Sequence, residues 1–142
     1  MKIMIVGSMA FAKEMDETKQ KLETMGHSVE VPCDTYDHIA DSTLRSDEIK
    51  NKEHATKNDV FRRCFDLLAD SDAILALNMN QNGIRGYIGV ACLMEIGLAH
   101  YLKKKIFILN RIDPTERYAT DVEILGGITL NGEIQKIQEF SN

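Results

Sequence analysis

The sequence predicts an α/β protein whose helices cover both faces of a parallel sheet. Short apolar runs alternate with longer segments of helical periodicity along the chain. Strands that are separated by helices pair in parallel, because the helix supplies the crossover between them. A chain of 142 residues is long enough for one well-formed core, so we expect a single domain over residues 1–142.

The first third of the chain predicts a strand, a helix and a second strand. Residues 2–6 (KIMIV) form an apolar run that ends at Gly7, which indicates a buried strand. A helix is expected from about Phe11 to Gly26, since glycine commonly follows the end of a helix. Residues 28–31 (SVEV) predict the second strand. The apolar face of the helix carries Met15, Leu22 and Met25.

Residues 34–57 are polar and weakly patterned, which predicts a mobile loop with one exposed helical piece at most. Asn58 follows this segment, and its side chain is of the type that caps a helix. The helix predicted after it has one apolar side, made of Val60, Cys64, Leu67 and Leu68.

Two more apolar runs complete the main strands of the predicted sheet. Residues 73–77 (AILAL) and 105–109 (KIFIL) predict the third and fourth strands, and residues 89–102 predict the helix between them. Residues 128–130 predict a fifth strand, and residues 132–140 predict a closing helix.

Right-handed crossovers favour the strand order 2-1-3-4-5, a flavodoxin- or Rossmann-like three-layer sandwich. Ligands bind such sheets at the carboxyl ends of the strands, where the winding direction switches between strands one and three. Two loops therefore bear on ligand binding, residues 7–11 (GSMAF) and residues 78–89 (NMNQNGIRGYIG). The polar residues 110–125 are expected to form a loop over this crevice or a subunit contact.

Composition excludes several classes of protein. A formal net charge of −5 argues against a nucleic-acid polymer as partner, since such partners need a basic face. The sequence has no run of 18 apolar residues and begins with a strand rather than a signal peptide. Cys33, Cys64 and Cys92 are widely spaced, and neither they nor the histidines show a metal-ligand spacing. We therefore expect reduced thiols in a cytoplasmic protein, with no metal and no cofactor.

Glycine recurs at every third position just before the predicted helix over residues 89–102. Gly83, Gly86 and Gly89 would let the backbone approach a ligand closely, and the amides at a helix start favour an anion. Arg85 could add a charge-assisted contact to a phosphate. The alternative is a glycine-rich turn with an exposed arginine, and the spacing matches no known nucleotide fingerprint.

Glu95 lies near the middle of a helix (GVACLMEIGLAHYL) that otherwise belongs in a core. Burial of a carboxylate costs several kcal/mol unless it is hydrogen-bonded, paired or neutralised. Its neighbours one turn away, Ala91 and Ala99, are small, which would leave room for a flat or ring-shaped ligand. The alternative is a structural role, in which Glu95 bonds a backbone amide or pairs with Arg62, Arg63 or Lys103.

The segments DSDAILALN and GYIGVACLMEIGLAHYLKKKIFIL resemble the nucleoside 2-deoxyribosyltransferase-like superfamily, which includes the deoxynucleoside 5′-monophosphate N-glycosidases. The hallmark is a Glu-hydrophobic-Gly-x-Ala element, present here at residues 95–99. An Asn-Asp pair at residues 58–59 and a first strand that ends Val6-Gly7-Ser8 are similar too. An uncharacterised microbial subgroup resembles the chain further, with GSMAF near its start and YIG before the glutamate.

The resemblance implies that Glu95 attacks the anomeric carbon of a nucleoside or nucleotide, and that water or a second base resolves the glycosyl-enzyme. A carboxylate stabilises the oxocarbenium-like transition state of such a reaction. Asp59 would position the sugar or protonate the departing base, although a first-turn helix charge explains it equally well. Family members are often dimers or larger, so a homo-oligomer is expected.

The chain departs from the family pattern at four positions. Gly89 stands where the transferases have an acid and the glycosidases a serine, Ala91 and Leu93 replace glycines, and Met4 replaces a tyrosine. These differences favour hydrolysis of a nucleotide N-glycosidic bond over base exchange. The alternative is a nucleotide-binding or sensing domain without turnover.

The candidate ligand-binding residues are Gly7, Ser8, Met9, Asn78, Gly83, Arg85, Gly86, Tyr87, Gly89 and Ala91. Tyr87 and Tyr118 could stack on a base or simply pack.

Overall fold

A computed structural model describes residues 1–141 and shows one five-stranded parallel sheet. The strand order is β2-β1-β3-β4-β5, which confirms the predicted order, and every pairing is parallel. The strands are β1 (Lys2–Val6), β2 (Ser28–Glu30), β3 (Ala73–Ala76), β4 (Lys105–Ile108) and β5 (Gly127–Thr129).

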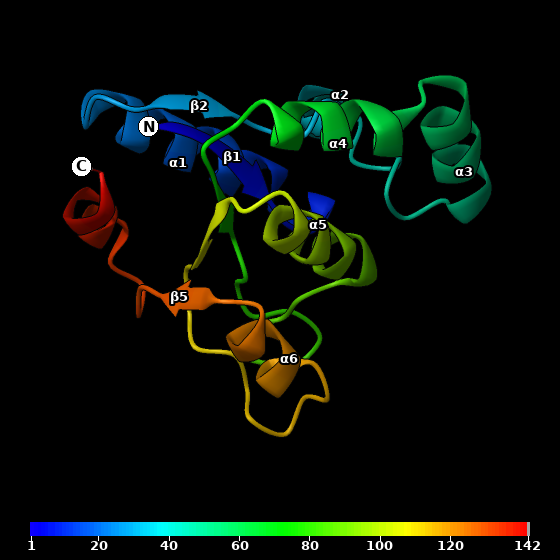
Figure 1. Ribbon diagram of the computed structural model, residues 1–142. Helices are drawn as coiled ribbons and strands as arrows, with labels where there is room; N and C mark the ends of the chain where they lie inside the picture. Colours follow the sequence, from blue (N-terminus) through cyan, green and yellow to red (C-terminus); the bar gives the residue numbers. More distant parts are fainter. Residues whose placement is uncertain (142) are drawn as a thin grey trace.

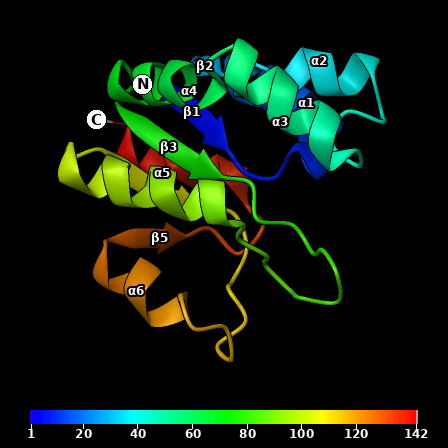
Figure 2. The same cartoon turned by 90° about the vertical axis from the view of Figure 1, so that its right-hand side faces the viewer.

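Six α-helices and two 3₁₀ helices connect and cover these strands within residues 1–141. They are η1 (Met9–Phe11), α1 (Ala12–Thr24), α2 (Thr35–Ala40), α3 (Glu48–Lys57), α4 (Val60–Ala69), α5 (Val90–Tyr101), α6 (Ala119–Ile124) and η2 (Ile134–Phe140). Helices α4, α5 and α6 lie on one side of the sheet, and α1 and η2 lie on the other (Figures 1 and 2).

Alternate residues of each central strand enter two separate cores. In β1, Ile3 and Ile5 join the core under α1 and η2, whereas Met4 and Val6 join the core under α4, α5 and α6. Successive side chains of a strand point to opposite faces, so a strand covered on both faces must be apolar throughout. All four residues of β3 are buried for this reason, and the predicted three-layer sandwich is confirmed.

Residues 34–57 are not the mobile loop that their polar composition predicted. They hold α2 and α3, and α3 lies beside α4 in both views (Figures 1 and 2). Thr35 and His38 of α2 are buried. The sequence did not predict α2 because a helix of only six residues is too short to show a clear apolar period.

The expected cap of α4 is also wrong. Asn58 ends α3 instead, where its amide Nδ2 donates to the carbonyl of His54 at 2.8 Å. Asp59 precedes α4 in the left-handed conformation, with φ 48°, and its side chain makes no capping hydrogen bond. The reversal of the chain between α3 and α4 therefore takes place at these two residues.

One further expectation for the second half needs correction. The polar composition of residues 110–125 predicts a loop, but they include α6, whose Val122 is buried against the sheet. The closing helix predicted over residues 132–140 is present as a 3₁₀ helix over Ile134–Phe140.

Among residues 1–141, none of the helices has the length and apolar character needed to cross a bilayer.

Candidate functional site

A cavity of about 370 Å³ opens at the carboxyl end of β1, on the side where α4 and α5 meet. We call it the Glu95 cavity. The loops after β1 and β2 form its floor, and α2, α3, α4 and α5 contribute its walls. It thus lies at the switch point between β1 and β3, where ligands bind in this class of sheet.

Glu95 reaches this cavity from the second turn of α5 and has no counter-ion among residues 1–141. The residue is 7% exposed, and its Oε2 atom has no hydrogen-bond partner within the same range. The arginines considered above as structural partners of Glu95 bind other groups. Arg62 pairs with Asp59, and Arg63 donates to the carbonyl of Asn58. The ion pairs of the described chain do not include Glu95.

Burial sets the protonation state of Glu95. Loss of water contact raises the pKa of its carboxyl group from 4.5 to about 8, and the negative charge of Asp34 contributes in the same direction. With this pKa the carboxyl group is mainly protonated at neutral pH. A ligand that brings positive charge to this end of the cavity would favour the ionised form.

Asp34 is a second buried acid of the cavity, and sequence reasoning missed it. It lies between β2 and α2, and its Oδ2 is 3.1 Å from Nε2 of His38, one helical turn later. Both residues are buried and line the cavity. The i, i+4 spacing of Asp34 and His38 could have marked them in the sequence, but only if α2 had been recognised.

Six of the predicted site residues line the Glu95 cavity together. They come from the loop after β1, the loop after β3, and α5, and they are Gly7, Ser8, Met9, Tyr87, Ala91 and Glu95. Tyr118 is not among them; its hydroxyl accepts a hydrogen bond from the amide of Ile88 at 3.2 Å, which fits the alternative in which it packs.

Arg85 and Gly86 lie elsewhere, on a second hollow of about 570 Å³ beside the ends of β3 and β4. We call it the Arg85 hollow; Asn110 and Arg111 also line it. Gly86 has φ 62°, and a Cβ atom there would lie 2.3 Å from the carbonyl oxygen of Arg111. Its amide donates to Oδ1 of Asn80 at 3.1 Å, so this amide is already occupied.

Asn78 fastens the loop after β3 to the chain after β4. Its Nδ2 donates to the carbonyl oxygens of Asn110 (2.7 Å) and Gly86 (3.3 Å), and its Oδ1 accepts from the amide of Asn110 (2.9 Å). The side chain is buried, so these bonds replace water completely. Asn78 therefore positions the loop and does not line the Glu95 cavity.

The other predicted residues occupy turns. Asn82 and Gly83 both have positive φ between Gln81 and Ile84, whose backbones exchange two hydrogen bonds, as in a two-residue hairpin turn. Gly89 precedes the first residue of α5. Neither glycine lines the Glu95 cavity.

Asp59 is exposed, and its carboxylate pairs with Arg62 at 3.0 Å. It lines a shallow hollow next to the Glu95 cavity rather than the cavity itself. The two spaces are neighbours, because Arg45, Asn51, Ala55 and Phe61 line both.

Aromatic and cationic side chains complete the cavity opposite Glu95. Phe61 and Phe65 of α4 stack edge to face, with ring centroids 6.2 Å apart, and Tyr87 lies on the wall as well. Arg45 is the single lysine or arginine lining the cavity within the described chain. The cavity thus combines acids, an aromatic wall and one guanidinium, a set of groups suited to a charged ligand that carries a flat ring.

The fold is similar to that of two solved enzymes. The CMP N-glycosidase BcmB of Clostridium botulinum matches over 100% of both chains, with a TM-score of 0.55 and 15% sequence identity. A 2-deoxyribosyltransferase of Bacillus psychrosaccharolyticus matches over 86% of this chain and 82% of its own, with a TM-score of 0.55 and 18% identity. No family model and no curated protein matches the sequence. The predicted resemblance is thus confirmed at the level of the fold.

Proposed function

We propose that the protein hydrolyses the N-glycosidic bond of a nucleoside or deoxynucleoside 5′-monophosphate, with Glu95 as the nucleophile. The observation that carries the proposal is a buried carboxyl group, on the wall of a cavity, for which residues 1–141 offer no partner. A structural glutamate would be paired or hydrogen-bonded at that depth. The fold shared with an N-glycosidase and a deoxyribosyltransferase supports the same reading.

In the proposed reaction, an oxygen of the Glu95 carboxylate bonds to the anomeric carbon while the carbon–nitrogen bond breaks. The bonding electrons leave with the base, which takes up a proton from Asp59 or from solvent, and a glycosyl ester remains on Glu95. Water then attacks the same carbon and gives up a proton to solvent, which releases the sugar phosphate and restores the carboxylate. The positive charge that develops on the sugar in both steps is stabilised by the adjacent carboxylate in a site with little water.

Asp59 remains the candidate for orienting the sugar or protonating the base. Its place in the neighbouring hollow would require the ligand to extend past Phe61, or the α3–α4 turn to shift toward the cavity. Arg85 would contact the phosphate only if the ligand also reached the Arg85 hollow.

A binding domain without turnover is the second candidate. It is favoured by the raised pKa of Glu95, because a protonated carboxyl group is a poor nucleophile. Incubation with a panel of ribo- and deoxyribonucleoside 5′-monophosphates, followed by chromatography for free base, separates the candidates. Base release that disappears in Glu95→Ala supports hydrolysis. Thermal stabilisation by nucleotides without base release, in both proteins, supports binding alone.

We also propose that the protein forms a homodimer or larger homo-oligomer through α5. Val90, Met94 and Tyr101 lie on one stripe of this helix, and Val90 and Tyr101 are 78% and 80% exposed. Large apolar side chains grouped on one exposed face commonly mark a contact surface.

A further inference from the structure

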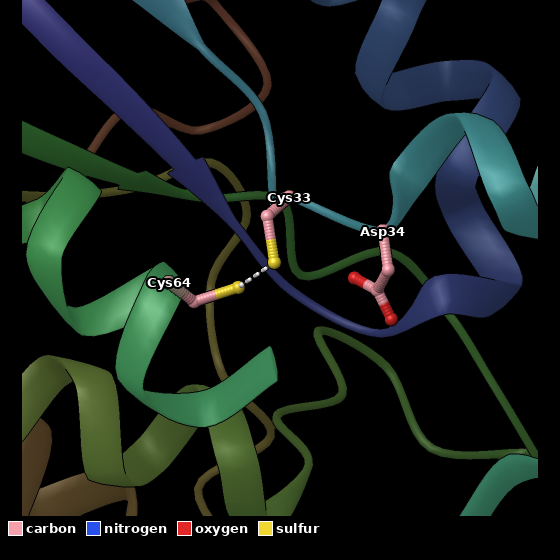
Figure 3. A group of neighbouring side chains, drawn as sticks. All are labelled: Cys33, Asp34 and Cys64. Carbon is pink, nitrogen blue, oxygen red and sulfur yellow. Dashed lines mark hydrogen bonds between the residues drawn. The ribbon is translucent and has the colours of Figure 1, made fainter. Parts of the chain in front are cut away.

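Two cysteines and an aspartate that are distant in sequence meet on one side of the Glu95 cavity. Cys33 and Asp34 follow β2, and Cys64 lies on α4, 31 residues after Cys33. The two sulfur atoms are 3.5 Å apart, and both lie within 4.8 Å of a carboxylate oxygen of Asp34. Figure 3 shows the sulfur atoms directed toward each other, with one oxygen of Asp34 turned toward them.

We propose that Cys33, Asp34 and Cys64 form a binding site for a thiophilic divalent cation, with Zn²⁺ as its occupant. Zinc takes thiolate ligands at about 2.3 Å and carboxylate ligands at about 2.1 Å in tetrahedral geometry. Those bond lengths place two sulfur ligands about 3.8 Å apart and a sulfur and an oxygen ligand about 3.6 Å apart. The sulfur pair, at 3.5 Å, already has nearly this spacing, and the Asp34 oxygen, which lies within 4.8 Å of both sulfur atoms, would have to move closer to them by at most about 1.2 Å.

The surroundings of the three ligands fit a metal site. His38 Nε2 lies 3.1 Å from Oδ2 of Asp34, which orients the carboxylate and leaves its other oxygen for the ion. Asp34 and Cys64 both line the Glu95 cavity, which gives the ion a path from solvent. The same cavity leaves the fourth position of the tetrahedron open to a water molecule.

The charge of the cavity favours a cation at this place. Asp34 lines the cavity beside the thiols, the Glu95 carboxyl group would be favoured in its ionised form by a nearby cation, and Arg45, the one arginine or lysine on its wall in the described chain, is exposed. Each thiol binds as a thiolate and releases its proton to solvent, so the two thiolates and the Asp34 carboxylate outweigh the charge of a bound Zn²⁺ and leave the site with a net charge of −1. The sequence predicted no metal because the cysteines lack a short spacing; the packing of α4 against the β2–α2 loop brings them together.

The test titrates Co²⁺ into protein that has been freed of metal with a chelator and kept reduced with a phosphine. Co²⁺ replaces Zn²⁺ at thiolate sites and absorbs strongly through sulfur-to-metal charge transfer. We expect this absorption to saturate at one ion per chain and to disappear when Zn²⁺ is added. Cys33→Ala and Cys64→Ala should lose it, and Asp34→Asn should weaken Co²⁺ binding at least tenfold.

Cys92 supplies the matched control. It is buried on α5, outside the cluster, so Cys92→Ala should retain the absorption. Because a cysteine variant could lose the site by unfolding, the wild-type protein is also alkylated with and without Zn²⁺. Zn²⁺ should protect Cys33, which is partly exposed, and peptide mapping identifies the protected residue.

The proposal is overturned if wild-type protein with three titratable thiols gives no thiolate charge transfer with Co²⁺. It is equally overturned if the absorption persists in the Cys33→Ala, Cys64→Ala double variant. The proposal also fails if the mass of the chain is lower by two hydrogen atoms under reducing conditions and Cys33 is found linked to Cys64. That result would show that the two residues form a disulfide instead. None of these outcomes depends on whether the protein cleaves nucleotides.

Discussion

Replacement of Glu95 by glutamine should stabilise the protein at neutral pH while removing its proposed activity. The folded chain holds the carboxyl proton up to a pKa of about 8, whereas the unfolded chain releases it near 4.5. Between these values the unfolded state binds fewer protons, so the free energy of unfolding falls as the pH rises. The amide of the Glu95→Gln variant stays neutral and avoids this loss.

The size of the effect follows from the pKa difference. Each pH unit between the two pKa values lowers the stability of the wild-type protein by about 1.4 kcal/mol. At pH 7 the accumulated loss is about 3 kcal/mol, and at pH 4.5 it is below about 0.5 kcal/mol. We therefore expect Glu95→Gln to be more stable by about 3 kcal/mol at pH 7 and nearly equal to wild type at pH 4.5.

Urea unfolding of metal-free protein at both pH values, followed by circular dichroism, measures the difference. Glu17→Gln is the matched control, because Glu17 is exposed on α1 and its replacement should change the stability by less than about 0.5 kcal/mol at either pH. A Glu95→Gln variant no more stable than wild type at pH 7, or a gain that is equal at both pH values, would refute the argument from burial.

Four further outcomes are expected. If Glu95 is the nucleophile, base release should rise about tenfold from pH 7 to pH 9 as the carboxyl group with pKa about 8 ionises, measured as kcat/KM for the best nucleotide. Gly86→Ala should lower the free energy of unfolding in urea by at least about 2 kcal/mol, because its Cβ would lie 2.3 Å from a carbonyl oxygen. Gly83→Ala is the control: Gly83 also has positive φ but has free space around it, so the loss should be about 1 kcal/mol. Asn78→Ala should cost about 3 kcal/mol, because it leaves three backbone groups without partners; unchanged stability would show that water replaces them. Met94→Asp should convert the proposed oligomer to monomers in light scattering after gel filtration, and a monomeric wild type would contradict this contact surface.

The sheet and Glu95 were predictable because both depend on strong local signals. The run KIMIV and its counterparts are apolar throughout, and two buried faces are the simplest reason for that pattern. Glu95 was conspicuous because a charged residue interrupts an apolar helix. The strand order then placed the helix of Glu95 beside the switch point, which was enough to locate the cavity.

The opposite wall of the cavity was not predictable in the same way. Asp34 precedes α2 and His38 lies on it, a helix too short to show a clear apolar period, and Arg45 lies between α2 and α3. The loop glycines also have a conformational reason that spacing does not reveal: Gly83 and Gly86 have positive φ, and a Cβ atom on Gly86 would meet a backbone carbonyl. The meeting of Cys33 with Cys64 depends on tertiary packing alone.

The cavity draws its two sides from different parts of the chain. The Glu95 carboxyl group lies on α5, which packs on the central strands, while residues 34–65 provide most of the remaining lining as one continuous stretch. If the cavity binds a ligand as proposed, substitutions or insertions within that stretch should change its specificity without disturbing the sheet that supports the helix of Glu95. Such a division would let one scaffold diversify its ligands while its chemistry stays fixed, and it identifies residues 34–65 as the segment to randomise in a search for altered specificity.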